Sequence, residues 1–295
     1  AEYRKYFFRY ASEFGFQSFP SVKTLETVTD DPRELNPFSY VMEKHQRNYG
    51  GNGKIAKYMQ AAYRYPENFS DFVYASQLLQ ADGIRYGVEH YRRNRGRCMG
   101  AIYWQLNDCW PVASWASVDY EGRWKALHYY AKRFFAPVMV SCEEQNWMTA
   151  EANMNREHFV YEKSIRLNVT NETLEDKKVL VKWALRNADA SVVKAEEREV
   201  TVPALSSVWL DKEEYPDVDV FGQYVSYEAW EGDTCISEGS VIFSYPKYFH
   251  YLDPQLSYRI EGDEIVVSAK AYAKGVEILN LSEDLILSDN YFDMS

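Results

Sequence analysis

The stretch YFFRYASEFGFQS, residues 6–18, indicates how the first part of this chain folds. The run from Tyr6 to Ser12 is apolar except for Arg9, which predicts a strand buried on both faces. Glu13 follows that strand directly, and Gly15 marks a turn after it. In barrels of alternating strands and helices, functional side chains gather at the carboxyl ends of the strands. Glu13 is therefore the first candidate functional residue.

Two strand-then-helix units are predicted before Pro137. A long loop follows the first strand, and apolar residues then recur at helical spacing over 68–95, with Ser70 as the expected N-cap. A second buried strand is predicted over 99–106 and a second helix over 123–135. Successive units of this kind imply parallel strands with right-handed crossovers, so residues 1–137 are predicted to be α/β.

The composition changes at Pro137. Up to that residue there are 19 Lys and Arg against 14 Asp and Glu, a net charge of +5, and after it 14 against 30, a net of −16. Alternating apolar and polar residues predict strands over 164–170, 178–185, 199–203, 223–230 and 240–245. Their spacing is typical of an immunoglobulin-like sandwich over 138–247. Three or four short strands are expected in the last segment, 248–295.

The segment AIYWQLNDCWPVASW, residues 101–115, carries the second set of candidate functional residues. It places Trp104, Asn107, Asp108 and Trp110 at or just beyond the end of the second predicted strand. Carboxylates and amides form hydrogen bonds with sugar hydroxyls, and indole faces suit the C–H-rich surface of a pyranose ring. With Glu13 at the corresponding end of the first strand, these residue types favour a carbohydrate site.

These motifs resemble those of a known family. SEFGFQSFPS, residues 12–21, is similar to the nucleophile segment of β-mannosidases of glycoside hydrolase family 2. YWQLNDCWPVASW and KALHYYAKRFFAPV, residues 103–115 and 125–138, resemble the eighth barrel strand and the closing helix of those enzymes. The resemblance implies a multidomain C-terminal portion: the last part of a (β/α)8 TIM barrel over 1–137, an immunoglobulin-like β-sandwich over 138–247, and the start of a second, truncated β-sandwich over 248–295.

The resemblance also implies an activity and assigns roles to residues. The expected activity is that of a retaining exo-β-mannosidase that hydrolyses terminal β-D-mannose residues, with Glu13 as the nucleophile. Trp104 would form a wall of the mannose subsite, with Asn107 and Asp108 nearby and Trp110 as a further candidate. The substrate would be a β-mannoside or manno-oligosaccharide, and this chemistry needs no metal or organic cofactor.

A second carboxyl group is needed for this reaction, about 5 to 5.5 Å from the first, to protonate the leaving oxygen. In the family that acid is the Glu of an Asn-Glu pair on an earlier barrel strand. The Asn-Glu pair of this sequence is Asn171-Glu172, within the predicted sandwich. We therefore expect the chain alone to be inactive, and to associate with a missing N-terminal part of the same enzyme or with itself.

Other interpretations remain open on the sequence alone. Glu13 could be a structural carboxylate paired with Arg9, and the tryptophans could belong to a core. The acidic sandwich could be a non-catalytic carbohydrate-binding or scaffolding module. The parent enzyme could also have another family 2 activity, β-galactosidase or β-glucuronidase.

Charge and cysteine content exclude several classes of function. The formal charge of −11 argues against binding to nucleic acid or to anionic membranes, which requires a cationic surface. The four cysteines lie far apart without metal-ligand spacing and are predicted to be free thiols. No apolar run reaches the length of a membrane span. We expect a cytoplasmic protein, or a lysosomal or secreted one if the source is eukaryotic.

Overall fold

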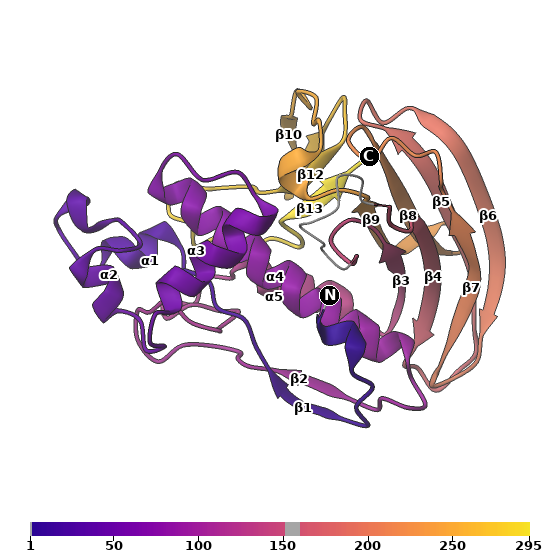
Figure 1. Ribbon diagram of the computed structural model, residues 1–295, viewed down its shortest axis with the longest axis horizontal. Coiled ribbons are helices and arrows are strands. Elements are labelled where there is room, and N and C mark those ends of the chain that lie inside the picture. Colours follow the sequence, from indigo (N-terminus) through magenta and orange to yellow (C-terminus); the bar gives the residue numbers. More distant parts are fainter. Residues whose placement is uncertain (1, 151–159) are drawn as a thin grey trace.

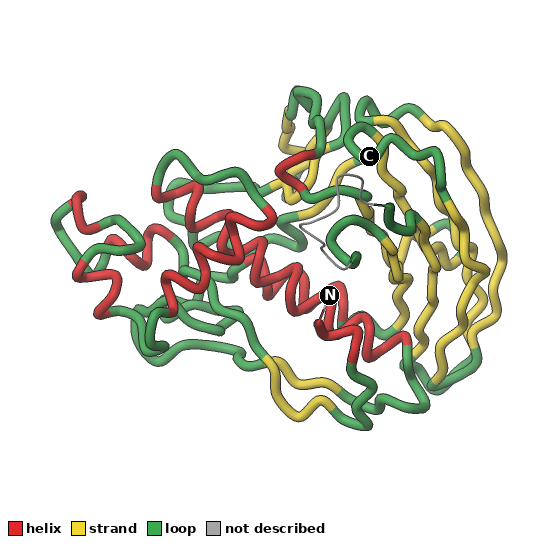
Figure 2. Tube along the Cα trace, viewed as in Figure 1, coloured by secondary structure: helices red, strands yellow, loops and turns green. Residues whose placement is uncertain are grey.

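The computed structural model describes residues 2–150 and 160–295. Helices gather on one side of the molecule and long strands on the other (Figures 1 and 2). The long helix α4, Phe69–Arg93, runs from the helical part to the strands. Among the described residues, no helix is both long enough and apolar enough to cross a membrane.

The strands on the right of Figure 1 form two antiparallel sheets. One sheet has the order β3-β4-β7 and the other the order β6-β5-β8-β9. The first comprises Val138–Gln145, Ser164–Asn171 and Ser206–Glu214, numbered β3, β4 and β7. The second comprises Lys177–Asn187, Val192–Val202, Gln223–Glu231 and Thr234–Ile242, numbered β5, β6, β8 and β9. This arrangement confirms the predicted immunoglobulin-like sandwich.

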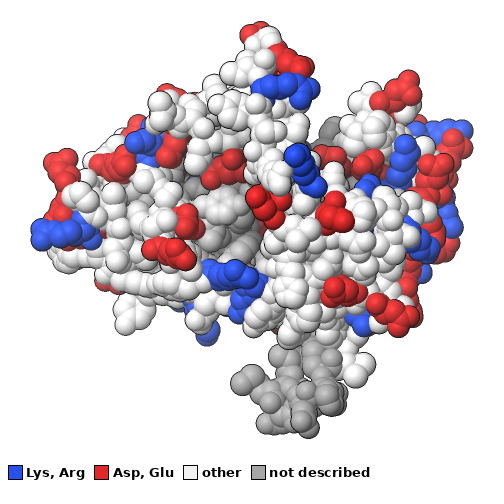
Figure 3. Space-filling view, turned by 90° about the horizontal axis from the view of Figure 1, so that it is seen from above, with Lys and Arg blue, Asp and Glu red and all other residues white. Residues whose placement is uncertain are grey.

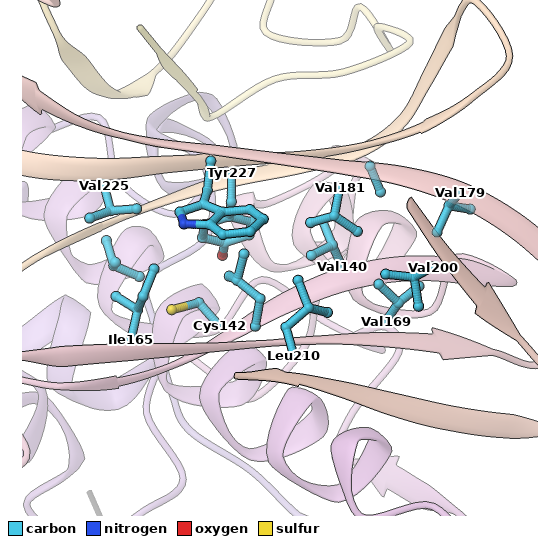
Figure 4. Close-up of a cluster of buried hydrophobic side chains, with 14 of the residues drawn as sticks. Val140, Cys142, Ile165, Val169, Val179, Val181, Val200, Leu210, Val225 and Tyr227 are labelled. Carbon is cyan, nitrogen blue, oxygen red and sulfur yellow. The ribbon is translucent and has the colours of Figure 1, made fainter. Parts of the chain in front are cut away.

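The space between the two sheets is filled by apolar side chains (Figure 4). In β5, buried Val179 and Val181 alternate with less buried residues, as expected where one face of a strand packs on a core. Val, Ile and Leu side chains from both sheets meet there, and a buried apolar side chain contributes about 1.5 to 3 kcal/mol. Members include Val140, Cys142, Ile165, Val169, Val200, Leu210, Val225 and Tyr227.

Two of the sandwich strands, β3 and β7, were not predicted, and β6 begins at Val192 instead of residue 199. The first eight residues of β6 are exposed, because this strand lies at the edge of its sheet. Its sequence VVKAEERE therefore has no apolar alternation to recognise.

The helical part is organised around α4. Its N-cap is Asn68, whose side chain accepts a hydrogen bond from the Asp71 backbone N–H, so the prediction of Ser70 as the cap was wrong. The second predicted helix is α5, Ala126–Phe134, which packs along α4. The long loop contains three short helices, α1, α2 and α3, at Val22–Glu26, Tyr40–Lys44 and Gly51–Ala62, and 3₁₀ turns lie at Glu2–Lys5, Pro32–Glu34 and Pro246–Tyr248.

The two predicted strands of the first part correspond to β1, Ala11–Phe14, and β2, Ala101–Tyr103, which pair in parallel as expected. Their predicted bounds were wrong: β1 begins at Ala11 instead of Tyr6 and includes Glu13, and β2 is shorter than the predicted range 99–106. The prediction that the run from Tyr6 was buried on both faces was wrong. Tyr6, Phe7, Phe8 and Tyr10 are each about half exposed, at 51, 52, 44 and 52%. The two strands form a two-stranded sheet with helices on one side only, so a second covering layer is missing from the described residues.

The C-terminal segment contains two hairpin-like pairs. β10 and β11, Ser257–Glu261 and Glu264–Ser268, form one antiparallel pair, and β12 and β13, Ala273–Val276 and Phe292–Met294, form the other. The second pair is tied to α4, because the Tyr74 hydroxyl donates to the Gly275 carbonyl at 2.7 Å. Tyr291 is buried in the same apolar cluster as residues of α4 and α5.

Candidate functional site

Glu13 lies on β1 with its side chain exposed. The next residue, Phe14, packs on α4, with its ring 5.7 Å from that of Tyr91. β1 does not alternate regularly: its pairing with β2 shifts register between Ala11 and Phe14, and both of these residues belong to the apolar cluster around Tyr91, whereas Glu13 is exposed. Within residues 2–150 and 160–295, no side chain forms an ion pair or hydrogen bond with its carboxylate, so no contact to Arg9 supports a structural role.

Trp104 lies beside this position on the neighbouring strand. Its backbone N–H donates to the Phe14 carbonyl at 2.8 Å, directly after β2 ends. Tyr103 packs on the helix side, stacked on Phe135 with 6.3 Å between ring centroids. Trp104 itself is 48% exposed, and Glu13 on the neighbouring strand is exposed as well. The peptide bond between Trp104 and Gln105 is cis.

Gly15 allows this close approach. A Cβ atom at this position would lie 2.5 Å from the Trp104 carbonyl oxygen and 2.8 Å from Cδ1 of Trp115. Neither distance is compatible with a side chain, and the carbonyl belongs to the backbone and cannot swing away. The glycine of SEFGFQS is thus required for packing between the two strand ends.

Asp108 and Asn107 occupy the loop after β2 but differ in environment. Asp108 is only 8% exposed and accepts a hydrogen bond from the Ser114 hydroxyl at 2.7 Å. Burial raises the pKa of the Asp108 carboxyl, while the Ser114 hydrogen bond and the nearby Lys125 oppose that shift. Asn107 is exposed, and its Nδ2 donates to the Asp108 carbonyl at 3.2 Å. Asp108 is therefore committed to intrachain contacts, whereas Asn107 is open to solvent.

Trp110 makes its contacts with the long loop before α3. Its ring stacks on His45 with 4.9 Å between centroids, and the Arg47 guanidinium lies 4.5 Å from the ring. His45 Nδ1 contacts the Pro111 carbonyl at 2.5 Å, which joins the same two loops. The structure thus brings Glu13 and Trp104 together and gives Trp110 other neighbours.

A buried polar network beneath the two strand ends was not predicted. Ser18 and Ser114 form a bridge with backbone hydrogen bonds of 2.9 and 3.1 Å. Gln80 of α4 accepts from the Ser18 hydroxyl at 2.7 Å and donates to the Phe16 carbonyl at 2.8 Å. Lys125 Nζ contacts the Ser18 and Ser114 carbonyls at 3.4 and 3.5 Å. The feature of the sequence that could have indicated this network is Gln80, a polar residue on the apolar face of the predicted helix.

Lys125 is the most strongly perturbed cation of this network. It is 1% exposed, and burial lowers the pKa of its ammonium to about 8, while Asp108 and Asp119 act in the opposite direction. Asp119 is itself buried and accepts from the Thr24 hydroxyl at 2.7 Å. Across the described parts of the chain, no group of three or more His, Cys, Asp or Glu residues is arranged to hold a metal ion.

A family model and several solved structures match parts or all of this fold. Residues 163–248 match the family model described as "Mannosidase Ig/CBM-like domain". The β-D-mannosidase of Dictyoglomus thermophilum superimposes on 99% of this chain with a TM-score of 0.85 and 25% identity, and the chain covers 34% of it. The exo-chitosanase CsxA of Amycolatopsis orientalis shares the fold over 94% of the chain, with a TM-score of 0.68 and 16% identity, and the chain covers 37% of it. The chain therefore has the fold of the corresponding part of these two enzymes.

Several curated proteins that match part of this chain are named β-mannosidases. β-Mannosidases of Capra hircus and Rattus norvegicus are 38% and 40% identical over 144 and 145 residues, each alignment covering 44% of this chain and 16% of the relative. β-Mannosidase B of Aspergillus niger is 36% identical over 149 residues, covering 49% of the chain and 18% of the relative. The chain thus matches about a sixth of the length of these proteins. Its resemblance to family 2 β-mannosidases is confirmed over that part of their length.

Proposed function

We propose that residues 1–137 contribute the last two strand–helix units of a (β/α)8 barrel in a retaining exo-β-mannosidase. The observation that carries this proposal is that Glu13 and Trp104 are both exposed at the carboxyl ends of paired parallel strands. The helices α4 and α5 cover one face of this pair. The similarity to β-mannosidases supports the same assignment. Residues 138–247 and 248–295 would be the sandwich and the start of a second β domain.

Glu13 would act as the nucleophile of a double displacement. Its carboxylate attacks the anomeric carbon of a terminal β-mannoside, a covalent mannosyl-enzyme forms as the glycosidic bond breaks, and water then hydrolyses it. An exposed carboxylate without a side-chain partner among the described residues is free to make this attack. Trp104 would provide an indole face for the sugar ring, and Asn107 a hydrogen-bonding amide. Asp108 and Trp110 would act nearby, Asp108 through the loop that it holds in place.

The general acid of this reaction would come from outside residues 1–295. Glu172, the only glutamate that follows an asparagine, lies in the sandwich and pairs with Arg95 and, at 3.8 Å, with Arg92 at the end of α4. It is therefore held by another part of the molecule. We expect the purified chain to show no turnover of aryl β-mannosides. Measurable hydrolysis by the chain alone would contradict this assignment.

The exposed face of β1 and β2 would meet the missing part of the barrel. Tyr6, Phe8, Tyr10, Ile102 and Trp104 are each 44 to 52% exposed around these strands. An apolar surface of this kind favours association, either with the remaining part of the enzyme or with a second copy. Light scattering of the purified chain should show self-association, and a strictly monomeric chain would count against the open-barrel arrangement.

The full-length enzyme that contains this chain provides the direct test. Glu13→Gln should lower kcat on an aryl β-mannoside by at least 1000-fold, because a neutral amide cannot form the glycosyl-enzyme, whereas Glu43→Gln on the exposed surface of α2 should leave it unchanged. Mass spectrometry after reaction with a slow 2-fluoro mannoside should locate the adduct on Glu13. A Glu13→Gln enzyme with ordinary turnover would remove Glu13 from the mechanism.

Assays of substrate preference and of sugar binding distinguish two other functions. Hydrolysis of aryl β-galactosides or β-glucuronides in preference to β-mannosides would indicate another family 2 activity. The description of the matched sandwich as CBM-like favours a test of sugar binding by residues 138–295 alone. The enzymatic interpretation predicts no measurable affinity of that part for manno-oligosaccharides.

A further inference from the structure

A cleft of about 900 Å³ lies between the helical part and the C-terminal segment, away from Glu13. Tyr63 and Tyr74, from the end of α3 and from α4, line one side, and Tyr251 and Leu256 line the other. Seen from above, the molecule is hollowed between these parts, with acidic and basic side chains at the border (Figure 3). This volume lies within the range of about 300 to 1,000 Å³ that is usual for small-ligand pockets.

Tyr251 offers an aromatic face to this cleft. Its ring stacks on Tyr272 with 6.0 Å between centroids and an angle of 19°, and contacts Phe249 at 4.8 Å. Phe249 and Tyr272 are fully buried, whereas Tyr251 remains 40% exposed. One side of the Tyr251 ring is thus packed and the other is open. An open aromatic face binds C–H-rich ligand surfaces by dispersion, as in the stacking of a pyranose ring.

Tyr130 and Lys274 add hydrogen-bonding groups with unused capacity. Tyr130 is only 5% exposed, lines this cleft and a neighbouring cavity of about 360 Å³, and its hydroxyl has no hydrogen bond within residues 2–150 and 160–295. The hydroxyl oxygen is accessible from the cleft, so water or a ligand can form a hydrogen bond with it. Lys274 Nζ donates to Asp293 at 2.9 Å and has further protons to donate.

The charged groups around Tyr130 are already compensated. Asp82 pairs with Arg85 at 3.2 Å and accepts from the Tyr63 hydroxyl at 3.3 Å, while Lys274 is paired with Asp293. A ligand with a net charge would disturb these buried pairs at a desolvation cost. The part of the cleft around Tyr130 therefore favours a neutral ligand group with both hydroxyls and an apolar face.

We propose that this cleft is a second carbohydrate site, which binds a neutral oligosaccharide with one sugar ring on Tyr251 and its hydroxyls bonded to Tyr130 and Lys274. The choice of a mannose oligomer rests on the proposed function, since the enzyme would meet that class of sugar. The site is separate from Glu13 and Trp104, and both of its walls are needed. Residues 138–295 alone lack the wall formed by α3 and α4.

The test is calorimetric titration of β-1,4-mannotriose into the 295-residue chain carrying Glu13→Gln, which excludes turnover. We expect saturable binding that weakens about tenfold with Tyr251→Ala, the loss of one stacking surface, and several-fold with Tyr130→Phe, which keeps the ring and removes the hydroxyl. Tyr248→Ala is the matched control, because Tyr248 is 42% exposed and does not line the cleft. Circular dichroism would verify that each variant is folded.

Two results would overturn the proposal. One is the absence of saturable binding, and the other is binding that Tyr251→Ala leaves unchanged. If Trp104→Ala abolishes the binding and Tyr251→Ala does not, the sugar occupies the candidate active site, which would support the proposed function and refute the second site. The two proposals are tested separately. If Glu13→Gln retains ordinary turnover, the proposed nucleophile is refuted, whereas the proposed cleft site is still decided by the titration.

Discussion

The core of the sandwich and the buried polar network beneath the two strand ends are both shielded from solvent, but different interactions stabilise them. Between the sheets, Val169, Val181 and Val225 are fully buried among other apolar side chains. Beneath the strand ends, Gln80 and Lys125 are equally buried, yet they hold the loops by hydrogen bonds to specific backbone carbonyls.

The difference shows where the molecule tolerates change. An apolar core is stabilised by the summed area of many side chains, so one truncation leaves a cavity but keeps the arrangement. The buried polar network depends on a few directional hydrogen bonds, and removal of one partner leaves another buried polar group without a hydrogen bond. We therefore expect substitutions near the strand ends to have larger and more specific effects than those in the sandwich.

The largest effect is expected for Gly15→Ala. The new Cβ would overlap the Trp104 carbonyl oxygen, which is 2.5 Å away, so the two strand ends must separate. We expect a loss of about 3 kcal/mol in the free energy of unfolding, measured by chemical denaturation. Gly53→Ala is the control, because a Cβ there meets nothing within 4 Å and Ala suits helix α3 better than Gly. Equal stability of the two variants would show that the contact with Trp104 is relaxed in solution.

The pH dependence of stability tests the role of Lys125 in the buried polar network. Its pKa is about 8 in the folded chain against an ordinary value of 10.5, so between these pH values the unfolded chain binds more protons. Stability should therefore rise with pH across that window, and Lys125→Met should lack this rise. We expect the difference in unfolding free energy between the wild type and the variant to change by up to about 3 kcal/mol from pH 8 to 10.5. A difference that is flat across this window would mean that Lys125 is solvated.

A truncation in the sandwich should cost less. Val181→Ala removes two buried carbons from a fully buried side chain and should lower the unfolding free energy by about 2 kcal/mol. Val193→Ala on the edge strand β6, where the side chain is 50% exposed, should change it by less than about 0.5 kcal/mol. If the exposed site proves as sensitive as the buried one, β6 is covered in solution.

The smallest effect concerns the start of α4. Asn68→Ala removes the side-chain acceptor for the Asp71 N–H, and about 1 kcal/mol of stability should be lost. Ser70→Ala should be nearly neutral, because Ser70 is exposed inside the first turn. Thermal unfolding of the two variants would rank them, and the reverse order would restore Ser70 as the cap.

Sequence patterns predicted the elements better than their environments. The helices α4 and α5, the parallel pair β1 and β2, and most sandwich strands follow from apolar periodicity, which is a local property. The prediction that the run from Tyr6 to Tyr10 is buried was wrong. An apolar sequence shows that packing against another layer of structure is favourable, but it does not show that such a layer is present. β3 and β7 were missed, since their VMVSCEEQ and SSVWLDKEE sequences alternate poorly.

The candidate site shows the same division. Glu13 and Trp104 were identified as candidates because strand ends and residue types can be read along the chain, although their catalytic roles remain predictions. The contacts of Gln80 and of Lys125 with Ser18 join residues that are far apart in the sequence, which gives no sign of their proximity. The cleft beside Tyr251 is likewise formed by residues from α3, α4, α5 and the C-terminal segment.

The sequence by itself determined the strand-then-helix order, the sandwich, the glutamate at a strand end and the resemblance to family 2 β-mannosidases. Tertiary structure alone decided which side chains meet: that Gly15 lies against Trp104 and Trp115, that Lys125 is buried beneath both loops, and that Tyr130 lines a cleft together with Tyr251. The physical reason is that periodicity and propensity act over one or two turns of chain, whereas close packing and desolvation depend on partners distant in sequence.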